Sequence, residues 1–407
     1  MKVCVIGSGG REHALAHVLA RTAEVVVTPG NPGIPGSVPT PPADVDADLY
    51  VVGPEAPLVA GLADELRAAG KLVFGPGADG ARLEGSKVWM KEVVEAAGVP
   101  TARYAAFTEA EPAIEFLRGL PGPWVTKTDG LAAGKGVLVT DSLDEAIADV
   151  RAKLAGEVFG DAGRTVVIEE GMTGPELSIL AISDGTRAVA LAPAQDFKRV
   201  GDGDAGPNTG GMGAYSPVPA VDDDVVADVM GRFVEPTLAE LRRRGIDYRG
   251  VFYAGLMLTP DGPKLIEFNA RFGDPEAQVV LPRLTTDLAE LLAAAAAGDL
   301  TRAPTPTFAD GACVTVVLAV EGYPTAPRTG DLITGLDAAE AAGATVFCAG
   351  VGRRDDGELV TAGGRVLAVT GHGPTVAAAR EHAYKAAELV AWRGMHHRSD
   401  IAQEASH

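Results

Sequence analysis

The chain has 407 residues, of which 46% are hydrophobic, and carries a formal net charge of −20. This length exceeds what one hydrophobic core usually supports, so we expect two to four domains. The acidic charge disfavours long-range attraction to nucleic acid or to anionic membranes, so we expect neither as a partner. An anionic substrate must then be recruited by local clusters of basic residues.

Cysteine usage and hydropathy predict a cytoplasmic protein. Cys4, Cys313 and Cys348 are few, scattered and odd in number, which argues for reduced thiols rather than disulfides or zinc ligands. The first residues lead directly into a predicted strand, so we expect no signal peptide. The longest apolar tract, near 288–298, is too short and too rich in alanine to span a bilayer.

The N-terminal segment predicts a parallel α/β domain over 1–90. Buried-strand patterns at 2–6, 24–31 and 48–55 each end in a turn that carries polar groups, and a helix follows the first turn. Parallel strands place such turns at one edge of the sheet. The connection 32–47 is rich in proline and lacks helical periodicity, whereas a parallel crossover normally contains a helix. We therefore expect a shortened crossover there.

The first turn, GSGGRE at 7–12, is similar to a dinucleotide-binding fingerprint but has Glu12 where the third glycine is needed. That difference disfavours a dinucleotide-dependent reductase. The backbone amides of Gly9 and Gly10 at a helix N-terminus, beside Arg11, can instead cradle a phosphate or a carboxylate. A tight turn with a surface arginine explains the same residues equally well.

The remainder predicts an α+β domain over 91–296 and a small C-terminal α+β domain over 297–407. Segment 193–219 is rich in glycine and proline, which predicts a long functional loop or lid. A helix at 85–100 begins after Ser86 and ends at Gly98 and Pro100. Further helices are expected near 142–155, 222–244, 285–298 and 374–391, and strands near 122–127, 136–140, 165–170, 177–190, 252–259, 263–270, 314–320, 344–350 and 365–371.

The stretch TKTDGLAAGKGV, at 126–137, has the density of glycine and lysine that is typical of phosphate-binding loops. A Walker P-loop is excluded, because Gly136 follows Lys135 where that motif needs serine or threonine. The spacing therefore indicates a different phosphate-binding arrangement.

Glu267 and Asn269 alternate with Phe268 on a predicted strand, so they point to the same face. A carboxylate and an amide oxygen on one face suit Mg²⁺, which takes a few protein oxygens together with substrate phosphates. Arg271 continues that face and can meet an anionic substrate or a developing charge. An exposed strand edge with a solvated salt bridge is the competing interpretation.

Two further segments carry polar groups that could contact a ligand. A strand ends at Glu169 and Glu170, with Glu176 after a turn, and could pair with an adenine and its ribose, although acidic strand ends are common. Segment 196–217 has a glycine run that allows the backbone to approach a ligand. We favour a ligand loop over a linker, because polar residues concentrate there: Asp196, Lys198, Arg199, Asn208 and Thr209.

A lysine before a glycine-rich loop, a Glu-Glu strand end and a distal E-F-N-x-R strand resemble the ATP-grasp superfamily in order and spacing. Within it, the chain resembles the phosphoribosylamine–glycine ligases of purine biosynthesis through GGREHALA, VVGPEAPL, DGLAAGKGV, GPNTGGMGAYSP and IEFNARFGDPE. The resemblance covers nearly the whole chain. It implies an ATP-grasp fold with an N-terminal parallel-sheet domain, a mobile lid subdomain at about 106–177 and a small C-terminal α+β domain.

The resemblance also implies the role of each site residue. Contacts with ATP fall to Lys87, Lys127, Gly130, Gly134, Lys135, Gly136, Glu169, Glu170, Glu176 and Lys198. Glu267 and Asn269 bind Mg²⁺ or Mn²⁺, and Arg271, Asp274 and Lys135 act in catalysis. The substrates glycine and 5-phosphoribosylamine are held by Gly9, Gly10, Arg11, Asn31, Glu55, Asp196, Arg199, Asn208, Thr209, Gly210 and Arg271. A monomer is compatible with these expectations.

The chain departs from the family pattern in two further places. The stretch AGLML before E-F-N offers no acidic ligand, so a second Mg²⁺ needs ligands elsewhere. Thr126 and Thr128 flank Lys127 where the family carries smaller or more apolar residues. Two alternatives stay open, namely another purine-pathway ATP-grasp ligase or carboxylase, and a non-catalytic ATP sensor. A sensor is disfavoured because it needs no arginine for acyl transfer.

Overall fold

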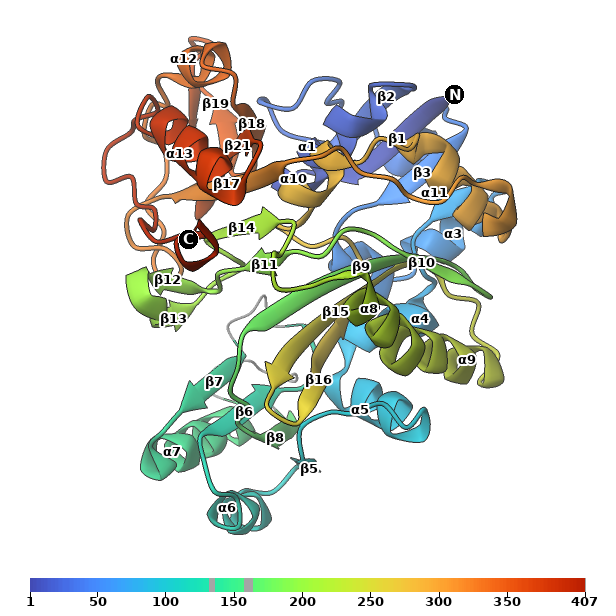
Figure 1. Ribbon diagram of the computed structural model, residues 1–407, viewed down its shortest axis with the longest axis vertical. Coiled ribbons are helices and arrows are strands. Elements are labelled where there is room, and N and C mark those ends of the chain that lie inside the picture. Colours follow the sequence, from blue (N-terminus) through green and yellow to red (C-terminus); the bar gives the residue numbers. More distant parts are fainter. Residues whose placement is uncertain (132–135, 157–163, 407) are drawn as a thin grey trace.

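The structure is a computed structural model that describes residues 1–131, 136–156 and 164–406. Within these ranges the strands form one five-stranded sheet, three four-stranded sheets and two ribbons of two strands each. Figure 1 shows the N-terminal elements (blue) and the C-terminal elements (red) on one side of a central sheet, and a smaller sheet (teal) on the other side. None of the described helices has the length and hydropathy needed to cross a bilayer.

The N-terminal sheet is parallel, as the sequence predicts, with strand order β2-β1-β3-β4. Near-continuous apolar runs form these strands because both faces of the sheet are covered. The crossover from β2 to β3 contains only a short 3₁₀ turn, η1 (Pro42–Asp44), which confirms the shortened connection. The elements are β1 (Lys2–Gly7), β2 (Glu24–Pro29), β3 (Leu49–Val52), β4 (Val73–Phe74), α1 (Gly10–Leu19), α2 (Glu55–Val59), α3 (Leu62–Ala68) and α4 (Ala78–Gly85).

The side chain of Glu12 fills the turn between β1 and α1. Its carboxylate accepts a hydrogen bond from the Gly9 N–H at 2.6 Å. A Cβ placed on Gly7 or on Gly53 would lie only 2.5 or 2.2 Å from atoms of Glu12. The glycines therefore make room for a carboxylate of the protein itself, which explains why this turn departs from a dinucleotide fingerprint.

The small antiparallel sheet has strand order β5-β8-β6-β7 and a core of its own beneath α6 and α7. Thr126 faces these helices, since its hydroxyl donates to Asp149 and Lys153 Nζ donates to its carbonyl at 3.0 Å. Thr126 thus lies on the face opposite Lys127, and its departure from the family pattern leaves the cavity wall unchanged. The elements are β5 (Tyr104–Phe107), β6 (Trp124–Thr128), β7 (Val137–Thr140), β8 (Val166–Glu170), α6 (Ala110–Arg118) and α7 (Leu143–Leu154).

The central sheet is antiparallel, with strand order β10-β9-β15-β16. The expected single strand at 177–190 is wrong, because the Asp184 carboxylate accepts hydrogen bonds from the N–H groups of Thr186 and Arg187 and closes a turn there. The expected helix at 222–244 contains a π-helical segment. The elements are β9 (Glu176–Asp184), β10 (Ala188–Ala190), β15 (Arg249–Thr259), β16 (Gly262–Asn269), α5 (Lys87–Ala96), α8 (Asp223–Val229), η4 (Met230–Val234), α9 (Glu235–Arg243) and α11 (Leu288–Ala297).

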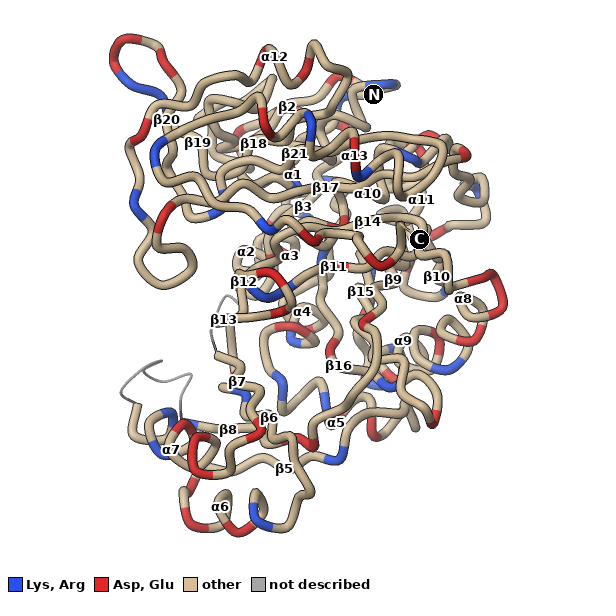
Figure 2. The backbone as a smooth tube through the Cα atoms, turned by 60° about the vertical axis from the view of Figure 1, so that its left-hand side comes forward, with Lys and Arg blue, Asp and Glu red and all other residues tan. Residues whose placement is uncertain are grey.

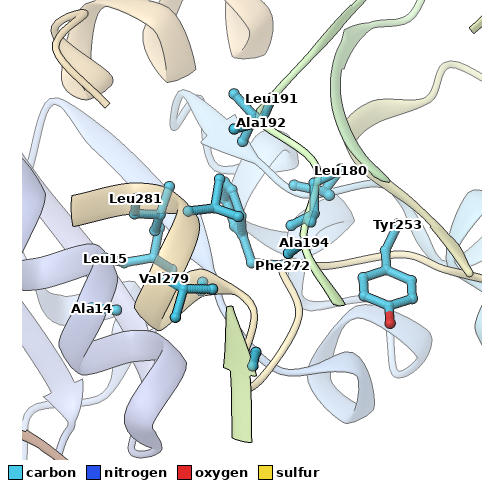
Figure 3. Close-up of a cluster of buried hydrophobic side chains, with 14 of the residues drawn as sticks. Ala14, Leu15, Leu180, Leu191, Ala192, Ala194, Tyr253, Phe272, Val279 and Leu281 are labelled. Atoms are coloured by element: carbon cyan, nitrogen blue, oxygen red, sulfur yellow. The ribbon is translucent and has the colours of Figure 1, made fainter. Parts of the chain in front are cut away.

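A continuous apolar core joins the N-terminal helix α1 to the central sheet. Figure 3 shows Ala14 and Leu15 of α1 beside Val279 and Leu281, with Phe272 next in the same cluster. Val279 belongs to α10 (Ala277–Val280), and the 3₁₀ turn η5 (Leu281–Arg283) follows it. This packing fixes the segment 271–276, which comes just before α10, against the N-terminal turns.

Segment 193–219 is not the long loop that its composition predicts. It contains four short strands, and two of them join the C-terminal sheet, whose order is β11-β14-β17-β21-β18. Such short strands escape detection because they carry no apolar run. They are β11 (Gln195–Asp196), β12 (Arg199–Gly201), β13 (Ala205–Asn208) and β14 (Gly213–Ser216).

The rest of the C-terminal part follows the expected α+β pattern, with one long helix beside the sheet. Its elements are β17 (Ala312–Ala319), β18 (Thr345–Cys348), β19 (Val351–Arg353), β20 (Leu359–Thr361), β21 (Arg365–Gly373), α12 (Leu336–Ala341), α13 (Val376–Ala387) and the 3₁₀ turns η6 (Leu300–Arg302) and η7 (Glu404–Ser406). The 3₁₀ turn η3 (Asp202–Asp204) lies earlier in the chain, between β12 and β13.

Candidate active site

A cavity of about 910 Å³ lies where the small sheet, the central sheet and the two terminal parts meet. Most of the residues predicted from the sequence line this cavity, although they come from distant parts of the chain. They are Arg11, Glu55, Lys87, Lys127, Gly130, Gly136, Glu169, Glu170, Glu176, Asp196, Lys198, Arg199, Asn208, Thr209, Gly210, Glu267, Asn269, Arg271 and Asp274. Gly134 and Lys135 lie outside the described residues.

A buried ionic cluster holds Lys127 at the cavity. Its Nζ lies 2.9 Å from Oε1 of Glu169, and Lys91 approaches the same oxygen at 3.2 Å. Burial raises the pKa of Glu169, but the two ammonium groups outweigh it and hold the pKa below its usual value. Burial lowers the pKa of Lys91 to about 8. Glu169 therefore binds both lysines through Oε1 in this structure.

Lys91 was not predicted from the sequence. It is fully buried and follows Lys87 by one helical turn on α5, so both lysines lie on the same side of that helix. This i, i+4 spacing is the signal that could have revealed it.

Lys87 lies at the start of α5, next to the first residues of the glycine-rich loop. Its Nζ donates to the Gly130 carbonyl at 2.9 Å. Ser86 is the predicted N-cap, and its hydroxyl accepts from the Trp89 N–H at 3.2 Å. The Asp129 carboxylate accepts from the Ser86 hydroxyl and from the Val88 N–H. These contacts fix the beginning of the loop against a helix N-terminus, where backbone N–H groups favour anions.

Glu267 and Asn269 lie on one face of β16, as expected from strand alternation. The Asn269 side-chain nitrogen donates to Oε1 of Glu267 at 3.2 Å, which leaves the Asn269 oxygen and Oε2 of Glu267 without a hydrogen bond from the described residues. Burial raises the pKa of Glu267, but Lys127 and Lys198 outweigh it and keep the carboxylate ionised. Two free oxygens fit Mg²⁺, which otherwise binds waters and substrate phosphates.

The described residues provide no further acidic metal ligand here. No group of three or more His, Cys, Asp or Glu side chains in the described ranges is placed to hold a metal ion. The strand before E-F-N carries no acidic residue in the stretch AGLML, and Glu267 and Asn269 are the predicted ligands on this face.

Lys198 occupies the other side of the cavity between two carboxylates. Its Nζ donates to Glu176 and lies 2.9 Å from Oδ1 of Asp196. Burial lowers the pKa of Lys198, but the two carboxylates outweigh it and raise the pKa well above its usual value. Glu170 also lines the cavity, where it accepts from the Arg103 N–H at 3.0 Å and lies 3.6 Å from Lys264 Nζ.

Arg271 is held by two carboxylates from the N-terminal part. Its Nη2 lies 2.9 Å from Oε1 of Glu84, and its Nε lies 3.5 Å from Oε2 of Glu55. Arg11 reaches the same Glu55 oxygen at 4.0 Å. Burial raises the pKa of Glu55, but Arg271 and Arg11 outweigh it and lower the pKa. At Glu84 the effect of burial outweighs the attraction of Arg271, so the pKa of this carboxyl group is raised.

Asp274 is bound by a second arginine that the sequence did not indicate. Arg365, at the start of β21, donates through Nη2 to Oδ2 of Asp274 at 2.9 Å and through Nη1 to the Asp274 carbonyl at 2.8 Å. The same Nη1 donates to the Gly211 carbonyl at 3.2 Å. Gln278 donates to Oδ1 of Asp274 at 2.6 Å. Arg365 therefore joins the turn at Asp274 to the segment after β13.

Three predicted substrate-binding residues do not line the cavity. Gly9 and Gly10 lie under the side chains of Asp274 and Gln278, where a Cβ on Gly10 would meet the Gln278 amide at 2.7 Å. The Asn31 amide donates to the carbonyls of Ser8 and Ala349 at 2.8 and 3.0 Å. In this structure Asn31 joins the N-terminal turn to the segment after β18.

The two antiparallel sheets, with Lys127 on one and Glu267 and Asn269 on the other, define the ATP-grasp class of enzymes. Family models agree along the chain. The N domain of phosphoribosylglycinamide synthetase matches residues 1–84, its ATP-grasp (A) domain matches 85–277 and its C domain matches 313–404. The chain belongs to the phosphoribosylglycinamide synthetase family, whose curated relatives are called phosphoribosylamine–glycine ligases.

Individual relatives are similar over their full length. The phosphoribosylamine–glycine ligase of Streptomyces coelicolor is 48% identical over 425 residues, covering 100% of both chains. That of Escherichia coli K12 is 48% identical over 424 residues, covering 100% of this chain and 99% of its own. The crystal structure of the Thermotoga maritima enzyme is 36% identical, with a TM-score of 0.88, and covers 99% of this chain and 100% of its own. The resemblance inferred from the sequence is thereby confirmed.

More distant structures share the fold alone. The biotin carboxylase domain of the Hydrogenobacter thermophilus 2-oxoglutarate carboxylase, solved with MgADP and bicarbonate, is 16% identical with a TM-score of 0.70. It covers 97% of this chain and 91% of its own. This similarity supports the ATP-grasp architecture but does not favour the carboxylase alternative, because the full-length relatives are ligases.

Proposed function

We propose that the protein joins glycine to 5-phosphoribosylamine with consumption of ATP, giving glycinamide ribonucleotide, ADP and phosphate. The observation that carries this proposal is the convergence of Lys127, Glu267 and Arg271 on one cavity. These residues come from three segments and supply a phosphate-binding cation, a metal-binding carboxylate and a cation for an anionic substrate. An enzyme for acyl-phosphate chemistry needs all three together.

In the first step a carboxylate oxygen of glycine attacks the γ-phosphorus of ATP, and the bond to the bridging β–γ oxygen breaks. ADP leaves and glycyl phosphate forms. Lys127 and Lys87 place positive charge beside the phosphates, and such fixed charges are the main source of rate enhancement in phosphoryl transfer. Glu169 and Gly130 hold the two ammonium groups in position before the substrate arrives.

A divalent cation held by Glu267 and Asn269 would neutralise charge on the phosphate oxygens. Mg²⁺ and Mn²⁺ both accept oxygen ligands of this kind. The Asn269 amide already restrains the Glu267 carboxylate through its hydrogen bond.

In the second step the amine nitrogen of phosphoribosylamine attacks the carbonyl carbon of glycyl phosphate. The C–O bond to phosphate breaks, phosphate leaves with the electron pair and the nitrogen loses a proton. Arg271 lies where it can bind the glycine carboxylate and then the developing oxyanion. Glu84 and Glu55 hold its guanidinium, and Arg365 holds the neighbouring Asp274.

We also propose the residue roles given under the sequence analysis, and domain boundaries at residues 90 and 296. The lid role of segment 106–177 is supported by its separate core beneath α6 and α7. Closure would exclude water, which otherwise hydrolyses acyl phosphates. The free, buried cysteines support the proposed cytoplasmic location, and the proposed assembly is a monomer.

Substrate-dependent ADP release tests the proposed function. We expect release that requires both glycine and phosphoribosylamine, with glycinamide ribonucleotide formed in equal amount. Release with bicarbonate in place of glycine would favour the carboxylase alternative. ATP binding without release under any of these conditions would favour a sensor.

A further inference from the structure

The segment after α13 returns to the cavity and ends beside it. We call residues 396–406 the C-terminal strap. Figure 1 shows the C-terminus beside β11 and β14, close to the β12–β13 ribbon. Glu404, near the end of the strap, lines the same cavity as Lys198 and Arg271. The strap is thus part of the cavity wall.

Arg398 of the strap is only 1% exposed. An arginine side chain is rarely buried to this extent unless it is paired. Its Nη1 lies 2.6 Å from Oδ1 of Asp204 and donates to the Arg199 carbonyl at 3.2 Å. Its Nε and Nη2 each donate to the Asp400 carboxylate at 2.7 Å. The guanidinium also stacks over Phe197, 5.0 Å from the ring centroid.

Other strap residues bind the turn of the same ribbon. The Ser399 N–H donates to Oδ1 of Asp202 at 2.8 Å, and the Gly203 N–H donates to Oδ2 of Asp400 at 2.8 Å. His396 Nε2 lies 2.9 Å from the Val200 carbonyl oxygen. Figure 2 shows basic and acidic positions on the β12–β13 ribbon, and the acidic side chains of Asp202 and Asp204 are the ones that bind the strap.

The ribbon needs this support. Two short strands with two backbone pairings are marginal on their own in water. Asp204 has φ = +53°, in the left-handed region that non-glycine residues rarely adopt. Arg398 binds the Asp204 carboxylate and so stabilises this conformation.

The ribbon carries residues of the cavity. Arg199, Asp204 and Asn208 line it, and Thr209 and Gly210 follow directly. The Gly210 carbonyl accepts a hydrogen bond from Arg365, which also binds Asp274. The ribbon is therefore linked through Gly210 and Arg365 to the part of the cavity that holds Asp274.

We propose that the C-terminal strap contributes to substrate binding. In this proposal Arg398 is a positioning residue that holds the β12–β13 ribbon in its substrate-binding conformation. This inference rests on the proposed function, because it assigns the ribbon to glycine and phosphoribosylamine rather than to ATP. Because the ribbon is already ordered, substrate binding does not have to offset the loss of conformational entropy that ordering it would cost. Loss of Arg398 therefore weakens substrate binding more than it slows the chemical step.

The strap has its own attachment to α13, which separates the role of Arg398 from that of the strap as a whole. Arg380 donates to the carbonyls of Ile401 and Ser399, and the Tyr384 hydroxyl donates to the Arg398 carbonyl at 2.8 Å. None of these bonds uses the Arg398 guanidinium. The variant Arg398→Ala therefore keeps the strap in place while removing the contacts of the guanidinium with Asp204 and the Arg199 carbonyl.

Kinetics of Arg398→Ala, Arg398→Lys and the matched control Arg393→Ala test the proposal. Arg393 is an exposed arginine just before the strap. For Arg398→Ala we expect KM for glycine or phosphoribosylamine to rise about tenfold while KM for ATP changes less than about twofold. Arg398→Lys should recover part of the loss, because one ammonium reaches a single carboxylate only. Arg393→Ala should match the wild type.

Hydrogen exchange gives a second readout that does not depend on activity. The amides of Gly203 and its neighbours in the ribbon should exchange faster in Arg398→Ala, while α13 keeps its protection. Unchanged ribbon exchange would overturn the proposal, as would wild-type KM values. A parallel rise in all three KM values together with lost protection in α13 would also overturn it, since that result marks general destabilisation. If wild-type protein fails to release ADP with glycine and phosphoribosylamine together, the proposed function fails, but ribbon exchange still decides the role of Arg398.

Discussion

Lys127 and Glu169 form a buried ion pair, with 2.9 Å between Nζ and Oε1. The carboxylate also meets Lys91, so one negative charge serves two positive charges. The cavity therefore keeps an excess of positive charge at this wall, although the chain as a whole is strongly acidic. That local excess is what a triphosphate requires.

Replacing Glu169 with glutamine should destabilise the protein, because it leaves two buried ammonium groups without a counter-charge. We expect the free energy of unfolding to fall by about 3 kcal/mol, measured by urea denaturation. KM for ATP should rise in the same variant, because Lys127 loses its anchor. Glu111→Gln, which removes the exposed partner of Arg151, is the control and should leave stability unchanged. Equal losses in the two variants would contradict the buried cluster.

Replacing Glu267 with glutamine should weaken the binding of the divalent cation. A neutral amide oxygen is a poorer ligand for Mg²⁺ than a carboxylate, so the free Mg²⁺ needed for half-maximal activity should rise about tenfold. The measurement is a titration of activity against free Mg²⁺ at saturating ATP. Glu290→Gln on α11, an exposed position, should titrate like the wild type. Identical curves for the two variants would exclude Glu267 as a ligand.

Replacing Arg271 with lysine should lower kcat/KM by about a hundredfold or more. Lysine keeps the charge, but it cannot contact Glu84 and Glu55 while also donating to a substrate oxygen. Steady-state kinetics with varied glycine measure the loss. The exposed Arg232, which pairs with Asp228 on the surface, provides the matched control Arg232→Lys. Near-wild-type kinetics in Arg271→Lys would show that the reaction does not need a guanidinium that contacts the two carboxylates and the substrate at the same time.

Acid should destabilise the contact between α1 and the C-terminal sheet through His13. Burial lowers the pKa of His13 to about 4, and its Nδ1 accepts from the Cys348 N–H at 2.8 Å. An unfolded histidine titrates near 6.5, so between about pH 6.5 and pH 4 only the unfolded state takes up the proton. Stability should therefore fall by as much as about 3 kcal/mol as the pH drops through this window.

His13→Gln isolates this contribution, because glutamine keeps a hydrogen-bond acceptor and does not titrate. Urea denaturation at several pH values should give a shallower decline for the variant than for the wild type between pH 6.5 and 4. Parallel declines would show that His13 does not control acid stability.

The sequence by itself determined the features that depend on local patterns. Strand alternation placed Glu267 and Asn269 on one face, and Ser86 marked the start of α5. Glu12 excluded a dinucleotide fingerprint, and the structure shows its carboxylate filling the turn. These inferences succeed because backbone periodicity, capping and turn geometry are set by residues that are close in the chain.

Only the tertiary structure decided which charges meet. Asn31 donates to the Ala349 carbonyl after β18, and Glu169 binds both Lys91 and Lys127. Arg365 and Arg398 reach partners that are 91 and 194 residues away in the chain. No periodicity encodes such pairs, because a buried charge is placed by the packing of whole elements and then binds the counter-charge that this packing brings near it.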